Sequence, residues 1–459
     1  MRSKLIVVLL CTLLFCFSVY GQNGAVERLL STPGLKNAAI GISVKSIKSG
    51  ESVAEYSSHV SMQPASLIKL FTTGLALEQQ GPDYRYKTLV KYSGVIENAV
   101  LKGNILIEGS GDPCPDSRFF PDYKLAECLV AWIKDAGIKE IEGSVLITGE
   151  EDHSELPGSW VWEDISNYYA AQHFPFNYRD NAYWLEFKTG ASGTPAELLS
   201  ITPPIPQISI INEVLASEKP GDNAWIFGGP YAKNLYVRGY LPQNRKSFKI
   251  KGAMHSPATC FVQEVTNKLM AEGIEIKNKP VRELPDKEWN AFESPALKEI
   301  VFFTNKQSVN LFSEALAKLS GSSGYESALK SLLTQMGSDT TGIVLKDGCG
   351  LSVFSAVPAN VFTDYLVWAH QKLGQVFTRS LLLAGTDKGI GAYCRNNTSL
   401  YNRLKAKTGS FFGARNLAGY ITTSTGEELA FCILINHYDC STTELQDAVG
   451  RFLSDMISF

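Results

Sequence analysis

Three short motifs in the sequence combine residue types that can carry out nucleophilic chemistry. The first is S-L-I-K at 66–69, which follows Pro64 at the start of a predicted helix. Residues i and i+3 share one face of a helix, so the Lys69 amine can reach the Ser66 hydroxyl. A free serine is a weak nucleophile, and a lysine whose pKa is lowered by burial or by other cations can act as its base. The first motif therefore predicts an activated serine, close to helix N–H groups that can stabilise an oxyanion.

The other two motifs supply polar groups that suit a peptide substrate. Ser308 and Asn310 form an S-x-N motif, in which a hydroxyl and an amide can relay a proton and hold a substrate amide. Lys407, Thr408 and Gly409 form a K-T-G motif on a predicted strand. The lysine and the hydroxyl suit a substrate carboxylate, and the glycine lets a substrate backbone lie along the strand edge.

Each motif is weak evidence alone, because S-x-x-K recurs at Ser327–Lys330 and K-T-G recurs at Lys188–Gly190. The first of these is expected to be a surface turn of a helix, and the second to belong to a loop-rich region. S-x-N occurs once. The ordered set of three on a helix, a helix start and a strand is much less expected by chance.

Composition narrows the class of protein. The chain has 459 residues, 44% of them hydrophobic and 19% charged, with a net charge of −3. This length suggests two to four domains. The small negative net charge does not indicate a surface that binds nucleic acid. No C-x-x-C occurs, and the six histidines form no metal-binding spacing. The sequence therefore predicts neither a metal site nor a cofactor.

The N-terminus is typical of a secretory signal. Arg2 and Lys4 precede an apolar stretch of ~15 residues, which is short for a membrane span of about 20. Small residues before Gln22 predict a signal peptide over 1–21, and an uncleaved anchor is the alternative. Seven cysteines remain in the mature chain, an odd number whose pairing the sequence does not give: Cys114, Cys128, Cys260, Cys349, Cys394, Cys432 and Cys440.

Periodicity predicts the elements that position the motifs. A hairpin near 38–57 precedes a helix over Ala65 to Glu78, and the β-rich stretch 86–255, possibly two small modules, follows. Strands at both chain ends with helices between them predict one α/β (α+β) domain made of 22–85 and 256–459, with 86–255 inserted. The later helices are expected at 258–273, 308–320, 325–336, 358–373 and 442–457, and the later strands at 403–408, 416–424 and 428–437.

The order of the three motifs resembles that of the penicillin-binding proteins and serine β-lactamases. The segments PASLIKLFTTGLAL, GSGDP, SVNLFSEAL, DGCGLS and KAKTGSFFGARNLAGYITTSTG are similar to the low-molecular-mass class C penicillin-binding proteins. About 240 residues separate Ser66 from Ser308, which fits that family's insertion and is too long for ordinary β-lactamases. The resemblance covers essentially the whole mature chain. It implies a penicillin-recognising serine transpeptidase/β-lactamase-like domain, with an antiparallel sheet flanked by helices and a large β-rich insertion.

The resemblance also implies an activity. Family members are D-alanyl-D-alanine carboxypeptidases and endopeptidases that cleave peptidoglycan stem peptides through an acyl-serine, and β-lactams acylate the same serine. The expected location is the periplasm of a Gram-negative-type bacterium, with loose membrane or cell-wall association. The balance of the two activities stays open. A serine β-lactamase and a non-catalytic peptidoglycan-binding scaffold are the alternatives, to be distinguished by how fast hydrolysed penicillin is released and by whether muropeptides are cleaved.

By the same resemblance, Ser66 is the nucleophile and Lys69 its proton acceptor. Ser308 and Asn310 assist proton transfer and position the substrate. Lys407 and Thr408 bind the terminal carboxylate of the substrate, beside Gly409. The backbone N–H groups of Ser66 and Ser410 bind the oxyanion.

Two features depart from the family pattern or stay open. The arginine that usually follows DGSGLS is Val353 here, and Cys349 replaces the serine, so recognition of the diamino-acid side chain in the stem peptide is in doubt. Asp164 in WVWEDIS is the candidate acidic residue for that side chain, or an ordinary loop aspartate. Nearby aromatic residues fit core packing, which is favoured, or a glycan-stacking surface: Trp160, Trp162, Tyr168 and Tyr169.

Overall fold

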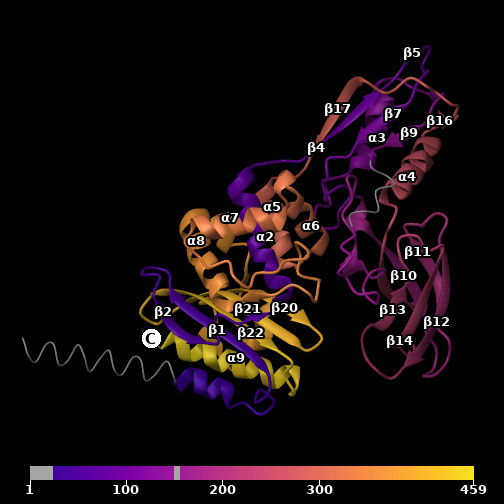
Figure 1. Ribbon diagram of the computed structural model, residues 1–459. Helices are drawn as coiled ribbons and strands as arrows, with labels where there is room; N and C mark the ends of the chain where they lie inside the picture. The colour runs from indigo at the N-terminus through magenta and orange to yellow at the C-terminus, as the bar shows by residue number, and fades with distance from the viewer. Residues whose placement is uncertain (1–23, 149–155, 459) are drawn as a thin grey trace, which may run out of the picture. The chain divides into compact units, whose positions relative to one another are not determined.

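The computed structural model describes residues 24–148 and 156–458 (Figure 1). The predicted signal peptide, 1–21, lies outside these residues. No helix in the described ranges has the length and apolar character needed to cross a bilayer. Two compact units divide the chain. The second unit comprises Asp83–Ile300 and Val309–Ala315, and the first unit comprises the rest.

The first unit is built on a six-stranded sheet that unites the two halves of the chain. Its strand order is β19-β20-β21-β22-β1-β2, and every neighbouring pair is antiparallel. β1 and β22 read as nearly continuous apolar runs because both faces of the sheet are covered. The strands are β1 (Ala39–Ser46), β2 (Ser52–Tyr56), β19 (Leu382–Leu383), β20 (Leu404–Phe411), β21 (Ala414–Thr422) and β22 (Glu428–Asn436).

Helices cover both faces of this sheet. α9 (Thr442–Ile457) lies on one face, while α2 (Ile68–Gln80) and α8 (Ala359–Thr378) lie on the other (Figure 1). A capping box starts α9, in which the Ser441 hydroxyl accepts from the Glu444 N–H at 3.2 Å. The predicted antiparallel sheet flanked by helices is confirmed. The unit also contains β3 (Ser61–Met62) paired with β18 (Val357–Pro358), and α7 (Tyr325–Gln335).

The second unit contains four sheets around one hydrophobic core. It contains the whole of two helices, α3 (Leu125–Asp135) and α4 (Pro257–Ala271). The four-stranded sheets hold β4 (Lys87–Tyr92), β7 (Ile105–Glu108), β9 (Val145–Ile147) and β17 (Lys287–Glu293), and β5 (Ile96–Glu97), β6 (Val100–Leu101), β8 (Glu140–Ile141) and β16 (Glu275–Ile276). The three-stranded sheets hold β10 (Ala182–Lys188), β11 (Glu197–Thr202) and β15 (Phe248–Ala253), and β12 (Ser209–Ser217), β13 (Asn223–Phe227) and β14 (Asn234–Pro242).

The boundary of the second unit differs from the predicted one. The inserted region was expected to end at 255, but the unit continues to Ile300. The reason is packing: Phe261 and Leu269 of α4 are fully buried in the core of this unit. β17 also pairs antiparallel with β4, so the chain that leaves the unit runs beside the chain that enters it. α5 (Leu297–Lys306) and α6 (Asn310–Lys318) are each divided between the two units.

Candidate active site

Ser66 and Lys69 lie in direct contact at the start of α2. Ser66 occupies the one-turn 3₁₀ helix η1 (Ala65–Leu67), which leads into α2 without a break. The Lys69 Nζ donates to the Ser66 Oγ at 3.0 Å, and the Lys69 side chain is completely buried. The i and i+3 spacing therefore gives the contact expected from the sequence. Ala65, just before the serine, has φ of 50°, a strained value for a residue with a Cβ that often occurs at functional sites.

The loop that carries D-G-C-G-L-S holds Lys69 from the other side. The Lys69 Nζ donates to the Cys349 carbonyl at 2.6 Å. The contact is made by backbone, which explains how cysteine can occupy the position where the family pattern has serine. The family resemblance indicates this loop, but residue identity alone does not reveal that its carbonyl accepts from the lysine.

Asp347 fixes the shape of that loop. Its carboxylate accepts from the N–H groups of Gly350, Leu351 and Ser352 at 2.9, 2.8 and 2.7 Å. Gly350 has φ of +75°, and a Cβ at this position would lie 2.0 Å from the Ala65 carbonyl oxygen. The glycine is therefore required for the loop to approach the turn that carries the nucleophile.

Lys407 and Ser308 form the second contact of the site. The Lys407 Nζ donates to the Ser308 Oγ at 2.9 Å and to the Thr408 carbonyl at 2.7 Å. Lys407 is 1% exposed, on the central part of β20. Ser308 has φ of 55°, so residues on both sides of the site adopt uncommon backbone conformations.

The two buried amines influence each other. Burial lowers the pKa of Lys407 well below its usual range, and the positive charge of Lys69 lowers that pKa further. Charging both amines at once costs free energy, because both side chains are buried. The arrangement thus favours a neutral Lys407 amine beside the Ser308 hydroxyl.

The edge of β20 faces the turn that carries Ser66. A Cβ on Gly409 would lie 2.6 Å from the Pro64 carbonyl oxygen, so this glycine allows the close approach of strand and turn. β19 pairs only with Ala406 and Lys405. Within the described chain no strand continues that pairing beyond Ala406, so the edge from Lys407 onward can accept an extended peptide. Ser410 is exposed on this segment and Thr408 is half-buried.

The lysines of the duplicate motifs each form an ion pair at the protein surface. Lys330 of the second S-x-x-K pairs with Glu326 at 2.6 Å on the outside of α7. Lys188 of the second K-T-G is exposed and pairs with Glu197 across β10 and β11. Neither lysine approaches a serine hydroxyl in the way that Lys69 does.

The second unit contains the two remaining predicted residues. Asn310 is the first residue of α6, and its Nδ2 donates to the Tyr169 carbonyl at 2.6 Å. The Tyr169 hydroxyl donates to Asp164 at 2.9 Å, and burial raises the pKa of the half-buried Asp164 carboxyl. One tyrosine thus connects the motif asparagine with the predicted acidic residue. That the three act on substrate remains a prediction.

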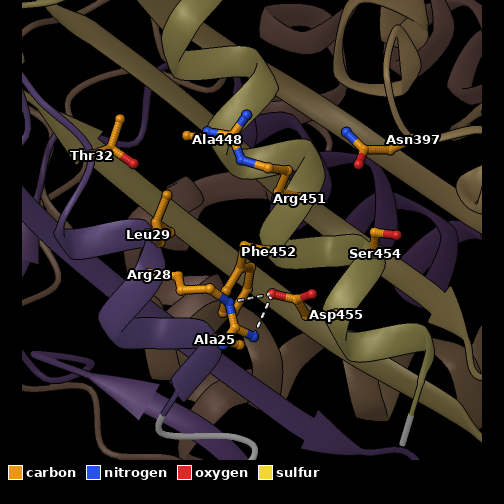
Figure 2. Close-up of a pocket in the computed structure, with 10 residues that line it drawn as sticks. All are labelled: Ala25, Arg28, Leu29, Thr32, Asn397, Ala448, Arg451, Phe452, Ser454 and Asp455. Carbon is orange, nitrogen blue, oxygen red and sulfur yellow. Dashed lines mark hydrogen bonds and ion pairs between the residues drawn. The ribbon is translucent and has the colours of Figure 1, made fainter.

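The first unit also contains a pocket outside the three motifs. Figure 2 shows this pocket of about 250 Å³ between residues 25–32 and α9. An ion pair between Arg28 and Asp455 at 2.8 Å closes one side, and Leu29 and Phe452 form part of the lining. None of the ten lining residues belongs to a motif.

A helix-flanked antiparallel sheet with a serine–lysine pair and a second buried lysine beside a serine defines the penicillin-recognising serine enzymes. Comparison with known proteins identifies the group within that class. Residues 22–456 match the D-Ala-D-Ala carboxypeptidase 3 (S13) family, and the chain belongs to this family. The predicted family and the predicted class of enzyme are thereby confirmed.

Relatives resemble the chain over most of their length. The D-alanyl-D-alanine carboxypeptidase DacB of Haemophilus influenzae is 26% identical over 434 residues, which are 90% of this chain and 88% of that protein. A D-alanyl-D-alanine carboxypeptidase of Actinomadura sp. is 26% identical over 461 residues, or 94% of this chain and 84% of that protein. Penicillin binding protein 4 (dacB) from H. influenzae has a similar structure, with a TM-score of 0.77, 24% identity and coverage of 94% and 98%. Its complex with a β-lactam gives a TM-score of 0.74.

Proposed function

We propose that Ser66 attacks the amide that follows a D-alanine in a peptidoglycan stem peptide and forms an acyl-serine that water then hydrolyses. The observation that carries this proposal is the Lys69 amine at 3.0 Å from the Ser66 hydroxyl, buried in the same site as Lys407. Cleavage at a terminal D-alanine is carboxypeptidase activity, and cleavage at a cross-link is endopeptidase activity. Both follow the same chemical steps.

Acylation requires Lys69 in its neutral form and begins with transfer of the Ser66 proton to that amine. The Ser66 Oγ forms a bond to the carbonyl carbon, and the carbonyl oxygen becomes an oxyanion. The N–H groups of Ser66 and Ser410 are the proposed donors to that oxygen, and one such donor typically lowers the barrier by about 3–4 kcal/mol. The carbon–nitrogen bond then breaks. The leaving amine takes the proton that Lys69 accepted, by way of the Ser308 hydroxyl, so Lys69 is neutral again when water enters. That hydroxyl accepts a hydrogen bond from Lys407 at 2.9 Å.

The substrate is held beside β20. Lys407 and Thr408 bind the terminal carboxylate, and Gly409 leaves room for the peptide backbone at the strand edge. A bound substrate carboxylate places a negative charge beside the buried Lys407 and favours its charged form. Substrate binding therefore raises the pKa of Lys407 again. Asn310 positions the substrate amide. Deacylation reverses the proton movements: water adds to the ester carbon, its proton goes to Lys69, and Ser66 regains one as it leaves.

Asp164 is the proposed acidic residue for the diamino-acid side chain. Its carboxylate is half-buried and hydrogen-bonded to Tyr169, which limits its motion. Val353 supplies no cation at the position where the family pattern has arginine. We therefore expect an ammonium at the end of that side chain to contribute more to binding than a carboxylate does.

The site of action follows from the predicted signal and the proposed substrate. We propose export to the periplasm, where peptidoglycan lies, with loose association with the membrane or the cell wall. β-Lactams are proposed to acylate Ser66, because their strained amide mimics the scissile bond and the opened ring stays attached after attack.

Digestion of purified muropeptides tests this function. The chain is expected to release D-alanine or to cleave cross-links, detected by mass spectrometry, and Ser66→Ala is expected to do neither. A wild-type protein that leaves both intact while binding the muropeptides would support a non-catalytic scaffold. Rapid release of hydrolysed penicillin would instead support a β-lactamase.

A further inference from the structure

A pocket of about 140 Å³ lies on the second unit, between the start of η3 (Tyr168–Ala170) and the strands β13 and β15. Its lining includes aromatic, cationic and acidic side chains. The residues that matter are Tyr168, Tyr169, Asp222, Trp225 and Lys251.

Aromatic rings around this pocket face solvent. Tyr168 is 41% exposed and Trp225 is 39% exposed. Trp184 is 38% exposed on β10, directly across the strand pair from Lys251. Single exposed aromatic residues are common, but Tyr168 and Trp225 line one hollow, with Trp184 beside its Lys251, and form a surface on which a flat ligand can stack.

Lys251 is held by rings rather than by a carboxylate. Its Nζ lies 3.7 Å from the centre of the Tyr168 ring and 5.1 Å from that of Trp184. In the part of the chain that the structure describes it forms no ion pair. Burial lowers the pKa of Lys251 to about 8, with a smaller contribution from Arg118. A partly desolvated ammonium of this kind gains from an oxygen acceptor on a ligand.

Asp222 adds a carboxylate, which is a hydrogen-bond acceptor, to the same pocket. One of its carboxylate oxygens accepts from the Ala224 N–H at 3.1 Å, and burial raises the pKa of the group. The pocket therefore combines ring faces, a donor and an acceptor. Pyranose rings match this set, because their C–H faces are apolar while their rims carry hydroxyl and amide groups.

We propose that this pocket binds a sugar ring of the peptidoglycan glycan strand, with the ring stacked on Tyr168 or Trp225 and its polar groups on Lys251 and Asp222. The inference rests on the proposed function, since the stem peptide to be cleaved is attached to that strand. Tyr169 lines the pocket while its carbonyl accepts from Asn310, so the sugar subsite and the motif asparagine share one residue of the second unit. The aromatic residues Tyr168 and Tyr169 then belong to a ligand surface, whereas Trp160 is buried in the manner expected of core packing.

Binding to glycan strands from which all stem peptides have been removed tests the proposal without any catalytic step. The wild type is expected to bind these strands in titration calorimetry. Tyr168→Ala and Trp225→Ala are each expected to bind about tenfold more weakly. The ratio of kcat/KM for a glycan-attached stem peptide to kcat/KM for the free peptide is expected to fall by a similar factor, through KM.

Tyr231→Ala is the matched control, because Tyr231 is an aromatic residue of the same unit that is 77% exposed and does not line the pocket. It is expected to behave as the wild type. Lys251→Met is a second variant, with weaker glycan binding expected, should an aromatic substitution unfold the unit in a thermal scan. Absence of wild-type binding to peptide-free glycan, or variants that bind as tightly as Tyr231→Ala, would overturn the sugar subsite. Failure of the proposed function would appear differently, as a wild type that is not acylated by penicillin.

Discussion

The side-chain nitrogen of Lys407 lies 2.9 Å from the hydroxyl oxygen of Ser308, although 99 residues separate the two in the sequence. The same amine is influenced by Lys69, which contacts Ser66. Three chain segments thus surround one serine. The first unit assembles this site because its sheet pairs N-terminal strands with C-terminal strands. In the sequence, these two groups of strands are separated by the residues of the second unit.

Lys69 is expected to be essential for acylation. Lys69→Ala removes the proton acceptor and should lower the rate of acylation by a fluorescent penicillin by about 10²–10⁴-fold. Lys330→Ala is the matched control, because it removes a lysine from the duplicate motif and breaks only a surface ion pair with Glu326. Equal rates for the two variants would show that Lys69 is not the base.

Lys407 is expected to recognise the terminal carboxylate. Lys407→Ala should lower kcat/KM by about 100-fold for a peptide ending in D-Ala-D-Ala, since a buried charge-assisted contact is lost. The same peptide with an amidated C-terminus lacks the partner charge, so the variant and the wild type should differ less on it. An identical loss on both peptides would place Lys407 in proton transfer alone.

Gly350 is expected to be irreplaceable. Gly350→Ala combines a left-handed φ of +75° with a Cβ at 2.0 Å from the Ala65 carbonyl oxygen, and should cost about 3 kcal/mol or more in unfolding free energy. Gly337→Ala shares the positive φ, at +77°, but its Cβ would meet open space, so its cost should be about 1 kcal/mol. Chemical denaturation compares the two. Similar costs would mean that the loop does not press on the turn before Ser66.

Asp112 is expected to make stability depend on pH. Burial raises the pKa of Asp112 to about 6 in the folded chain, against about 3.9 when unfolded. Between these values the folded state binds more protons, so the contribution of Asp112 to stability is present below about pH 4 and is lost as the pH rises through about 6. The loss should be about 3 kcal/mol. Asp112→Asn should flatten the profile in that window, measured by denaturation from pH 4 to 7. A variant profile that keeps the wild-type slope would assign the effect to other groups.

Much of the first unit could be predicted from the sequence, because its pattern is strong. The apolar runs near 38–47 and 428–437 became β1 and β22, and the amphipathic stretch at 442–457 became α9. The Ser66–Lys69 contact was predictable because helix geometry alone brings i and i+3 together. That Lys407 and Ser308 belong to one site was implied only by the family resemblance, and their direct contact was not predicted.

Other features had no local signal. The helical pattern at 258–273 was assigned to the catalytic domain, but the apolar face of α4 packs in the core of the second unit, and periodicity does not indicate which core a helix joins. The carbonyl of Cys349 and that of Tyr169 make key contacts through backbone, which residue identity does not reveal.

Peptide mapping of the penicillin adduct tests the central claim most directly. After incubation of the purified chain with penicillin, mass spectrometry is expected to find one adduct, on the peptide that contains Ser66, and Ser327→Ala is expected to be labelled as the wild type is. Ser66→Ala is expected to carry no adduct. An adduct on Ser66→Ala, or an adduct on another serine of the wild type, would contradict the assignment of the nucleophile.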